Sequence, residues 1–233
     1  MTNQLDLQSI ALAGHSNAKL ELSAEDIIKV HASRKALERF LMGYRGALDE
    51  MLTKIKILKD EFEVVHEYSP IEHVDSRIKS PQSIMAKVEL RGVERDFAAI
   101  RANIFDIAGI RITCAFISDI HLLADMLTRQ RDVVTLEVKD YVAHPKANGY
   151  KSLHLIVSVP VFMSDRVEDV PVELQIRTVA MDFWASLEHK IYYKYDRDVP
   201  AHILHELKRA ADVANDLDQT MENLRSQVDA LEA

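Results

Sequence analysis

Four short segments of this sequence combine residue types that bind phosphate groups and nucleotides. The first runs from Arg77 to Lys87, also contains Lys79, and has no acidic residue. Pro81 favours a helix start, and Ser83 and Lys87 would then point the same way, beside the helix N-terminal amides. Lysine supplies a point charge, serine a hydrogen-bond donor and arginine a planar fork, so the segment suits a polyphosphate. Taken alone, it could equally be a solvated basic turn.

An acid precedes a predicted strand in the second segment. Asp106 is followed by Gly109 and Arg111, which enter an apolar, β-branched stretch. A carboxylate at a sheet end suits Mg²⁺, because this ion takes oxygen ligands together with substrate phosphates. The structural alternative is that Asp106 caps a turn and Arg111 pairs with an exposed acid.

The third segment, residues 139–154, concentrates positive charge around a turn, with three lysines against one aspartate. Asn148 and Gly149 mark a tight turn with positive φ, and Tyr150 follows them directly. Cations and an aromatic ring around one turn suit a nucleotide, with the ring stacked on the base and the cations near the phosphates. The alternative is a hairpin turn whose tyrosines cover the core.

The fourth segment, residues 172–178, is ordered by strand alternation. Glu173, Gln175 and Arg177 share one face of the strand, and the apolar residues between them share the other. Glu173 could complete a metal site with Asp106 or accept a proton from a hydroxyl group. A solvated strand face is the commoner arrangement.

These segments need a mixed α/β (α+β) core, which we expect over residues 60–195. β-branched stretches predict five strands, and helical spacing predicts helices between them. The strands are expected at 62–68, 109–116, 133–138, 153–159 and 170–176, and the helices at 82–101 and 119–129. The connection after Val138 is too short for a helical crossover, so the strands beside it should be antiparallel.

Helices extend this core at both ends. We expect residues 1–22 to be a flexible N-terminus and a helix to begin at Ser23, with Gly43 and Gly46 as a place where it could break. In the C-terminal helix, residues 199–233, apolar residues alternate at spacings of three and four, as in a coiled coil. They are Leu207, Ala210, Ala214, Leu217, Met221, Leu224, Val228 and Leu231. The helix either packs on its own core or mediates self-association, and we favour self-association because the stripe reaches the last turn.

Composition narrows the class of protein. A chain of 233 residues with 48% apolar and 28% charged residues has the composition of a soluble globular protein. We expect no membrane span and no signal peptide, and the single cysteine excludes an internal disulfide and a thiolate zinc site. A reduced, cytoplasmic location follows as an expectation. A net charge of −8 argues against a general polyanion binder, so phosphate binding needs the local positive charge of the first and third segments.

In this order, the four segments resemble the (p)ppGpp synthetase family, the RelA/SpoT-type synthetase domain, and above all its single-domain members, the small alarmone synthetases. The resemblance covers residues 40–195, and residues 181–190 also fit it. It implies a nucleotidyltransferase-like synthetase fold over residues 23–198. It also implies a GTP pyrophosphokinase that transfers the βγ-pyrophosphate of ATP to the ribose 3′-hydroxyl of GTP or GDP and releases AMP, as in the stringent response.

The resemblance assigns roles by motif position. For ATP, it implies that the adenine lies between two arginines and that the phosphates are held by lysines and a serine: Arg77, Arg111, Lys79, Lys87 and Ser83. It implies Mg²⁺ bound by Asp106 and Glu173, with Glu173 as the base for the 3′-hydroxyl. For the guanine nucleotide, it implies stacking on Tyr150 and contacts from Lys146, Asn148 and His154, with Gln175 in support.

Partners and competing functions remain as expectations. We find no His-Asp pair with a downstream Glu-Asp pair, which predicts synthesis without hydrolysis. A homo-oligomer is expected, with a tetramer favoured, and regulation by an alarmone or by RNA stays open. The alternatives are a pyrophosphokinase acting on adenine nucleotides or the tRNA 3′-end, and a catalytically dead RNA- or nucleotide-binding regulator. Two carboxylates at a phosphate site argue against the dead regulator, since they repel the ligand unless a cation is present.

Overall fold

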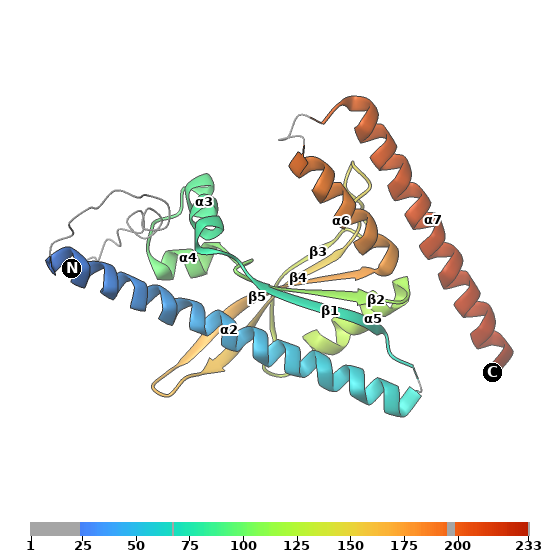
Figure 1. Cartoon of the computed structure of the whole chain (residues 1–233). Coiled ribbons are helices and arrows are strands. Elements are labelled where there is room, and N and C mark those ends of the chain that lie inside the picture. Colours follow the sequence, from blue (N-terminus) through green and yellow to red (C-terminus); the bar gives the residue numbers. More distant parts are fainter. Residues whose placement is uncertain (1–23, 67, 195–198, 233) are drawn as a thin grey trace.

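The computed structural model describes residues 24–66, 68–194 and 199–232, so the expected flexible segment 1–22 and the helix start at Ser23 lie outside it. Its elements, in chain order, are α2 Ala24–His66, β1 Ile71–Ile78, α3 Pro81–Arg91, α4 Phe97–Asn103, β2 Ala108–Cys114, α5 Ile117–Thr128, β3 Val134–Asp140, β4 Leu153–Phe162, β5 Val167–Thr178, α6 Val179–Lys194 and α7 Ala201–Glu232 (Figure 1).

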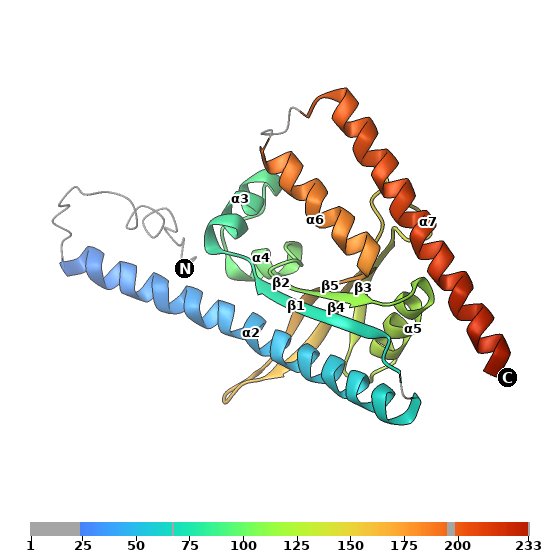
Figure 2. The same ribbon diagram turned by 45° about the vertical axis from the view of Figure 1, so that its right-hand side comes forward.

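The centre of the fold is one five-stranded mixed sheet in the order β1-β2-β5-β4-β3. β2 and β5 are parallel, whereas the other neighbouring pairs are antiparallel, including β3 with β4 as predicted. One sheet face carries the apolar residues of each strand, such as Ile112, Val157 and Leu174, which are fully buried and belong to the main core. α2 and α5 contact the sheet, and α6 and α7 lie across it from α2 (Figure 2). The predicted mixed five-stranded α+β fold is therefore confirmed.

The strand predicted at 62–68 is wrong, because residues 62–66 continue α2 and the first strand is β1. Val64 and Val65 are 82% and 63% exposed, so these β-branched residues take no part in a buried sheet. The sequence did not predict β1, because most of its residues are polar and exposed, as is common in an edge strand with one open face.

Gly43 and Gly46 marked a place where α2 could break, yet the helix is continuous. A Cβ on Gly43 would lie 2.8 Å from Glu168 Oε2, and one on Gly46 would lie 2.7 Å from Val161 Cγ1. Both glycines therefore serve close packing of α2 against β4 and β5. The helix predicted at 82–101 is divided, since Gly92 ends α3 in the left-handed conformation (φ 63°) and Asp96 caps α4.

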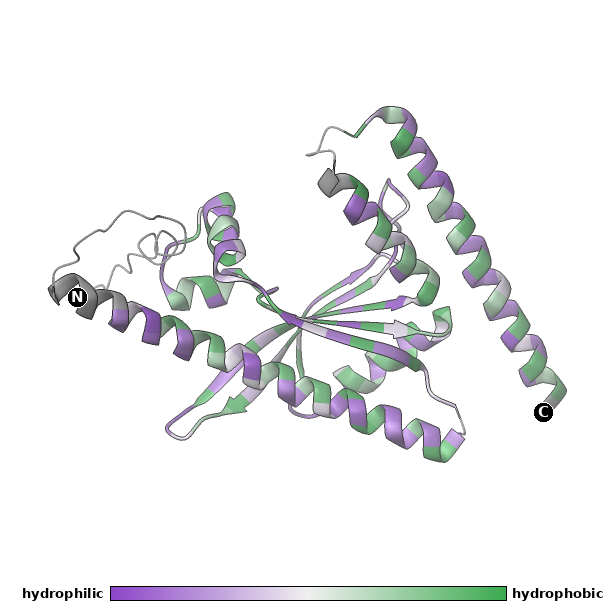
Figure 3. Cartoon of the chain, in the orientation of Figure 1, coloured by the Kyte–Doolittle hydropathy of each residue, from purple (hydrophilic) through white to green (hydrophobic). Residues whose placement is uncertain are grey.

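The first half of α7 bears out the interpretation that the C-terminal helix packs on its own core. Its first turns pack on the molecule, where Leu207 and Ala211 are buried in a small cluster with Trp184 and Ala185. Further along, the apolar residues are about half exposed: Leu217, Met221, Leu224 and Val228. Apolar positions recur along the whole helix in Figure 3. Self-association through the distal half stays a prediction. No helix in the described part of the chain is long and apolar enough to cross a membrane.

Candidate active site

The polar face of the sheet gathers residues from all four motif segments or their flanks. The strand register sets Arg77 opposite Gly109, and Gly109 opposite Glu173. It also sets Arg111 opposite Gln175 on β5. A pocket of about 290 Å³ lies over these strands and is lined by Asp75, Ser76, Arg77, Gly109, Ile110, Arg111, Glu173 and Gln175. Two guanidinium groups and two carboxylates thus border one space that is large enough for part of a nucleotide.

Beside this pocket, Asp106 joins the two lysines of the first segment. Lys79 Nζ and Lys87 Nζ lie 2.5 Å and 2.6 Å from Asp106 Oδ2, and we call these three residues the Asp106 cluster. Burial alone would raise the pKa of Asp106, but hydrogen bonds and charges from both lysines outweigh burial and lower that pKa. The carboxylate therefore stays ionised and holds both ammonium groups at one point.

The start of α3 brings Lys87 to this cluster. Ser80 is the N-cap, and its hydroxyl oxygen accepts from the Ser83 amide at 3.2 Å. Pro81 occupies the first turn, as the sequence predicted, because a missing amide proton costs nothing there. Ser80 Oγ lies 2.9 Å from Ser83 Oγ, so the helix N-terminus presents two hydroxyl groups. One turn later, Lys87 reaches back to Asp106.

Asp106 also has an oxygen suited to a metal ion. Its Oδ1 is buried without a hydrogen-bond partner, which is costly for a charged oxygen unless something else binds there. In the described ranges, His, Cys, Asp and Glu do not form a group of three or more that could hold a metal. Mg²⁺ commonly needs only one or two carboxylates, because substrate phosphates and water complete its shell. The residues present fit such a substrate-completed site.

The second half of the candidate site is the tyrosine loop, residues 141–152 between β3 and β4. Lys146 Nζ lies 4.6 Å from the ring centroid of Tyr141 and 4.7 Å from that of Tyr150, which are cation–π distances. Gly149 adopts a positive φ of 88°, as the Asn-Gly turn predicted. The loop thus presents a cation between two aromatic rings.

The aromatic side chains of the loop connect to His154 on β4 and, through it, to the catalytic candidate Glu173 on β5. Tyr150 Oη lies 2.8 Å from His154 Nε2, and His154 Nδ1 lies 3.8 Å from Glu173 Oε1. Gln175 Nε2 donates to Glu173 Oε2 at 2.9 Å. Burial, followed by the charges of Arg177, Lys146 and Lys139, lowers the pKa of His154 to about 4. The imidazole is therefore neutral at physiological pH.

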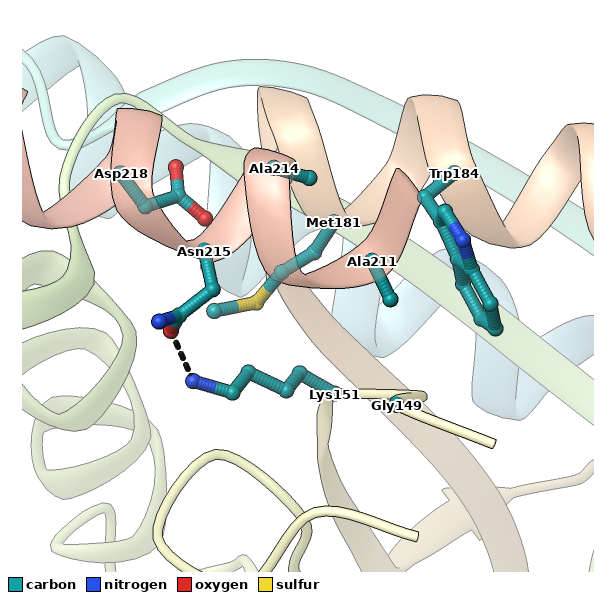
Figure 4. Close-up of a pocket in the computed structure, with 8 residues that line it drawn as sticks. All are labelled: Gly149, Lys151, Met181, Trp184, Ala211, Ala214, Asn215 and Asp218. Atoms are coloured by element: carbon teal, nitrogen blue, oxygen red, sulfur yellow. Dashed lines mark hydrogen bonds between the residues drawn. The ribbon is translucent and has the colours of Figure 1, made fainter. Parts of the chain in front are cut away.

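α7 lies against the tyrosine loop, with α6 beside it (Figure 4). Lys151 Nζ donates to Asn215 Oδ1 of α7, and Asn148 Nδ2 donates to Glu188 Oε1 of α6 at 3.1 Å. A Cβ on Gly149 would lie 2.5 Å from Ala211 Cβ, so only glycine allows this approach of loop and helix. Thr178 Oγ1 donates to Asp218 Oδ2 at 2.7 Å and ties α7 to the end of β5.

Comparison with known proteins fits this architecture. A model of the region found in RelA and SpoT proteins matches residues 76–198. The chain is 49% identical over 189 residues to the GTP pyrophosphokinase YwaC of Bacillus subtilis, which covers 81% of this chain and 90% of that protein. The chain belongs to the RelA/SpoT family.

Solved structures of another RelA/SpoT-type protein, the small alarmone synthetase 1 from Bacillus subtilis, share the fold. The structure bound to its product pppGpp has a TM-score of 0.76 and 38% identity, covering 83% of this chain and 98% of that one. The structure bound to AMPCPP has a TM-score of 0.72 and 36% identity, covering 84% of this chain and 99% of that one. The predicted resemblance is therefore confirmed.

The residues singled out from the sequence fall into two groups in the structure. One surrounds the pocket and the Asp106 cluster, and the other is the tyrosine loop with His154. Asp106 and Glu173, predicted to share a metal, have separate partners here: two lysines for Asp106, and Gln175 with His154 for Glu173. Asn148 accepts from the Tyr150 amide at 3.1 Å and shapes the turn.

Sequence reasoning placed Arg177 on the polar face but gave it no role, and it did not single out Ser152 or Asp182. All three are connected, because Arg177 NH1 donates to Asp182 Oδ1 at 3.1 Å and Arg177 Nε donates to Ser152 Oγ at 3.3 Å. The alternation of residues 173–177 was the one signal for Arg177 in the sequence. Asp182 comes from α6, and its spatial neighbours are not visible in any sequence pattern.

Proposed function

We propose that this chain is a GTP pyrophosphokinase that transfers the βγ-pyrophosphate of ATP to the ribose 3′-hydroxyl of GTP or GDP, which yields AMP and pppGpp or ppGpp. The observation that carries the proposal is the meeting of a pocket bordered by arginines with a lysine–carboxylate cluster and an aromatic, lysine-bearing loop. These parts match the needs of two nucleotides, one bound for its polyphosphate and one for its base and ribose.

ATP occupies the side of the site that contains the Asp106 cluster. Arg77 and Arg111 line the pocket and offer planar guanidinium faces for the adenine ring. Lys79 and Lys87 bind the phosphates, with the hydroxyl of Ser83 and the N-terminus of α3 beside them. The arriving phosphates compete with Asp106 for the two ammonium groups, so substrate binding releases a carboxylate as it engages the lysines.

The guanine nucleotide occupies the tyrosine loop. The Tyr150 ring stacks on the guanine base, and Lys146 supplies positive charge for the phosphates. Asn148 holds the turn, while His154 and Gln175 border the ribose next to Glu173. The neutral state of His154 leaves the charge of Glu173 available for the hydroxyl proton.

Glu173 is the proposed general base. The 3′-oxygen attacks the β-phosphorus of ATP, the hydroxyl proton passes to Glu173, and the bond from that phosphorus to the α,β-bridging oxygen breaks, with AMP as the leaving group. Asp106, through its unpartnered Oδ1, and Glu173 would hold Mg²⁺. When bound, Mg²⁺ neutralises charge on the phosphate oxygens. The lysines contribute by orienting the same phosphates, since this reaction depends mainly on positioning and charge.

The test is a nucleotide assay with purified protein, Mg²⁺ and labelled ATP, together with GTP, GDP or neither. We expect AMP in equal amount with a new guanine nucleotide that carries two additional phosphates, and no such product without an acceptor. Product formed only with adenine nucleotides or tRNA would reassign the acceptor. No AMP under any condition would contradict the proposal and leave a nucleotide-binding protein.

We further propose that the distal stripe of α7 mediates self-association, with a tetramer as the favoured state. Leu224 is 49% exposed in that stripe, and an exposed apolar row at coiled-coil spacing is typical of a helix that pairs with another. Leu224→Glu should lower the oligomeric state measured by light scattering. Leu90→Glu, at an 87% exposed leucine on α3, should leave it unchanged. Equal behaviour of the two variants would contradict the proposal.

A further inference from the structure

Arg177 is a buried cation at the centre of the polar face, with a side chain only 6% exposed. We propose that Arg177 is a positioning residue that fixes Tyr150 and Gln175, and through them the orientation of Glu173 toward the acceptor hydroxyl. This inference rests on the proposed function and assigns a role to a residue outside the nucleotide-contacting set described above.

The first step runs through Gln175. Arg177 NH2 donates to Gln175 Oε1 at 2.8 Å, which leaves the amide nitrogen of Gln175 to donate to Glu173 Oε2 at 2.9 Å. An amide has one accepting end and one donating end, and a guanidinium can only donate. Arg177 therefore decides which end of Gln175 faces Glu173. With the opposite end, two acceptor oxygens would meet and Glu173 would turn away.

The second step runs through Tyr150. The same NH2 group donates to Tyr150 Oη at 2.6 Å, and Tyr150 Oη lies 2.8 Å from His154 Nε2. The phenol oxygen accepts from Arg177, and in the tautomer that the inference requires, its own proton is donated to His154 Nε2. The remaining imidazole proton then sits on Nδ1, the atom that faces Glu173 at 3.8 Å. Both routes from Arg177 thus end at the two oxygens of Glu173.

The third step concerns the other side of Arg177. Asp182 Oδ1 accepts from Arg177 NH1 and lies 3.3 Å from Arg111 Nε as an ion pair. Arg177 Nε donates to Ser152 Oγ, and that hydroxyl donates to the carbonyl of Ile176 at 3.3 Å. One guanidinium therefore touches the tyrosine loop, β5 and α6 together. Asp182 extends the connection to an arginine of the ATP pocket.

Energetics favour a positioning role over a purely stabilising one. Burying the Arg177 cation brings little net stability, because its loss of hydration offsets its attraction to Asp182, whose side chain is 26% exposed. An apolar side chain would satisfy the core at less cost. Lysine cannot replace arginine here, since four acceptors at different angles need the fixed fork of a guanidinium.

The test is a double-mutant cycle with Arg177→Lys, Tyr150→Phe and the double variant, measured as kcat and KM for GTP and for ATP. We expect Arg177→Lys to raise KM for GTP and lower kcat, each about tenfold or more, and to change KM for ATP less than threefold. In the wild type, loss of the Tyr150 hydroxyl should lower kcat/KM for GTP. In Arg177→Lys the same loss should change kcat/KM little further, because the guanidinium that bonds to the hydroxyl is already absent. Tyr150→Phe keeps the ring for stacking, so the cycle isolates the hydroxyl.

Arg101→Lys is the matched control. Arg101 is a partly buried arginine that pairs with Glu168, and it bonds to none of the residues of the Arg177 network. It should lower the melting temperature without changing the kinetic constants. The inference would be overturned if Arg177→Lys lowered the melting temperature but left kcat and KM for GTP unchanged. It would also be overturned if the variant raised KM for GTP and KM for ATP equally. Additive effects in the cycle would overturn it too.

If Arg177→Lys does not fold, the cycle of Tyr150→Phe with Asp182→Ala decides, since among the contacts of the described residues Arg177 is the side chain that bonds to both Tyr150 and Asp182. Non-additive effects on kcat/KM for GTP support the inference, and additive effects reject it. A wild-type protein that makes no product would instead reject the proposed function. The two failures are therefore distinguishable.

Discussion

The Asp106 cluster and the tyrosine loop solve different problems with different means. In the Asp106 cluster, charge is gathered at one carboxylate oxygen, and the side chains of Lys79 and Lys87 are long and mobile by nature. In the tyrosine loop, aromatic rings, amides and a buried arginine form a connected network backed by α6 and α7. A polyphosphate needs charge within reach, whereas a hydroxyl nucleophile needs a fixed direction. The contrast teaches that orientation is concentrated on the acceptor side.

The largest expected effect comes from removing the base at the end of the fixed network. Glu173→Gln keeps the size of the side chain and an oxygen for Gln175 Nε2, but it cannot take the hydroxyl proton. We expect kcat to fall about 10²- to 10⁴-fold, the usual contribution of a general base. Binding of both nucleotides, measured by calorimetry, should change only a few-fold. A kcat within threefold of wild type would show that proton transfer to Glu173 is unimportant.

A smaller and differently distributed effect is expected on the side of the Asp106 cluster. Lys79→Met removes a phosphate-binding charge while Lys87 still holds Asp106, so KM for ATP should rise about tenfold, as for the loss of one charge-assisted contact. KM for GTP should stay nearly constant. Steady-state kinetics with each nucleotide varied in turn gives both values.

Lys54→Met is the control for Lys79→Met. Lys54 is 16% exposed, as is Lys79, and it also pairs with an aspartate, Asp132, at 2.7 Å. Lys54 belongs to α2 and has no place in the proposed site. Similar losses of ATP affinity in both variants would contradict the assignment of Lys79, and a rise in KM for GTP would contradict the separation of the two sides.

Two glycines of positive φ test how far the tyrosine loop depends on α7. Gly149→Ala strains the backbone and brings a methyl group against Ala211, whereas Gly92→Ala strains the backbone in open space. Both should lose about 1–2 kcal/mol of stability from backbone strain. Gly149→Ala should in addition raise KM for GTP about fivefold, because loop or helix must move. Urea unfolding of the two variants measures the stability lost to backbone strain. Steady-state kinetics measures the rise in KM for GTP caused by displacement of the loop. Equal KM values for GTP in Gly149→Ala and Gly92→Ala would show that GTP binding by the tyrosine loop does not depend on its packing against α7.

Sequence reasoning succeeded where one pattern decides the structure. Runs of β-branched residues predicted the buried strands β2, β4 and β5. Strand alternation predicted that Glu173, Gln175 and Arg177 share one face of β5. It failed at Val64 and Val65, which lie exposed in the last turn of a long helix, because β propensity counts only where a sheet forms around the residue. β1 was missed because an edge strand with an open polar face has no apolar run.

The sequence predicted which residues form the candidate site but not which of their atoms make contact. The types and order of the motif residues identified the Asp106 cluster and the tyrosine loop. Which atoms meet depends on residues that are distant in the chain, as when α7 supplies Asn215 to Lys151 and α6 supplies Asp182 to Arg177. Such contacts leave no periodic trace in a single sequence. For the same reason, the orienting role of Arg177 emerged only from the structure.

Acidification should separate the two regions without any change of sequence, because their pKa shifts have different consequences. The pKa of Asp106 is lowered, so its pairing contributes stability at neutral pH, and that contribution is lost as pH falls below the ordinary range of a carboxyl group and through the lowered value. The pKa of His154 falls from 6.5 to about 4, so the unfolded chain binds the extra proton first. Stability from the neutral imidazole is therefore complete above pH 6.5 and declines as pH falls toward 4.

His154→Gln measures this smallest effect, which vanishes at neutral pH. Glutamine can still accept from Tyr150 Oη but does not titrate. Between pH 7 and pH 5 the wild type should lose about 2 kcal/mol more than the variant, as expected for a shift of this size at about 1.4 kcal/mol per pH unit. Urea unfolding without nucleotide or metal, followed by the fluorescence of Trp184, gives both curves. Parallel curves would show that His154 is not held neutral by its burial and by its cationic neighbours. The tyrosine loop would then lack the acid sensitivity that distinguishes it from the Asp106 cluster.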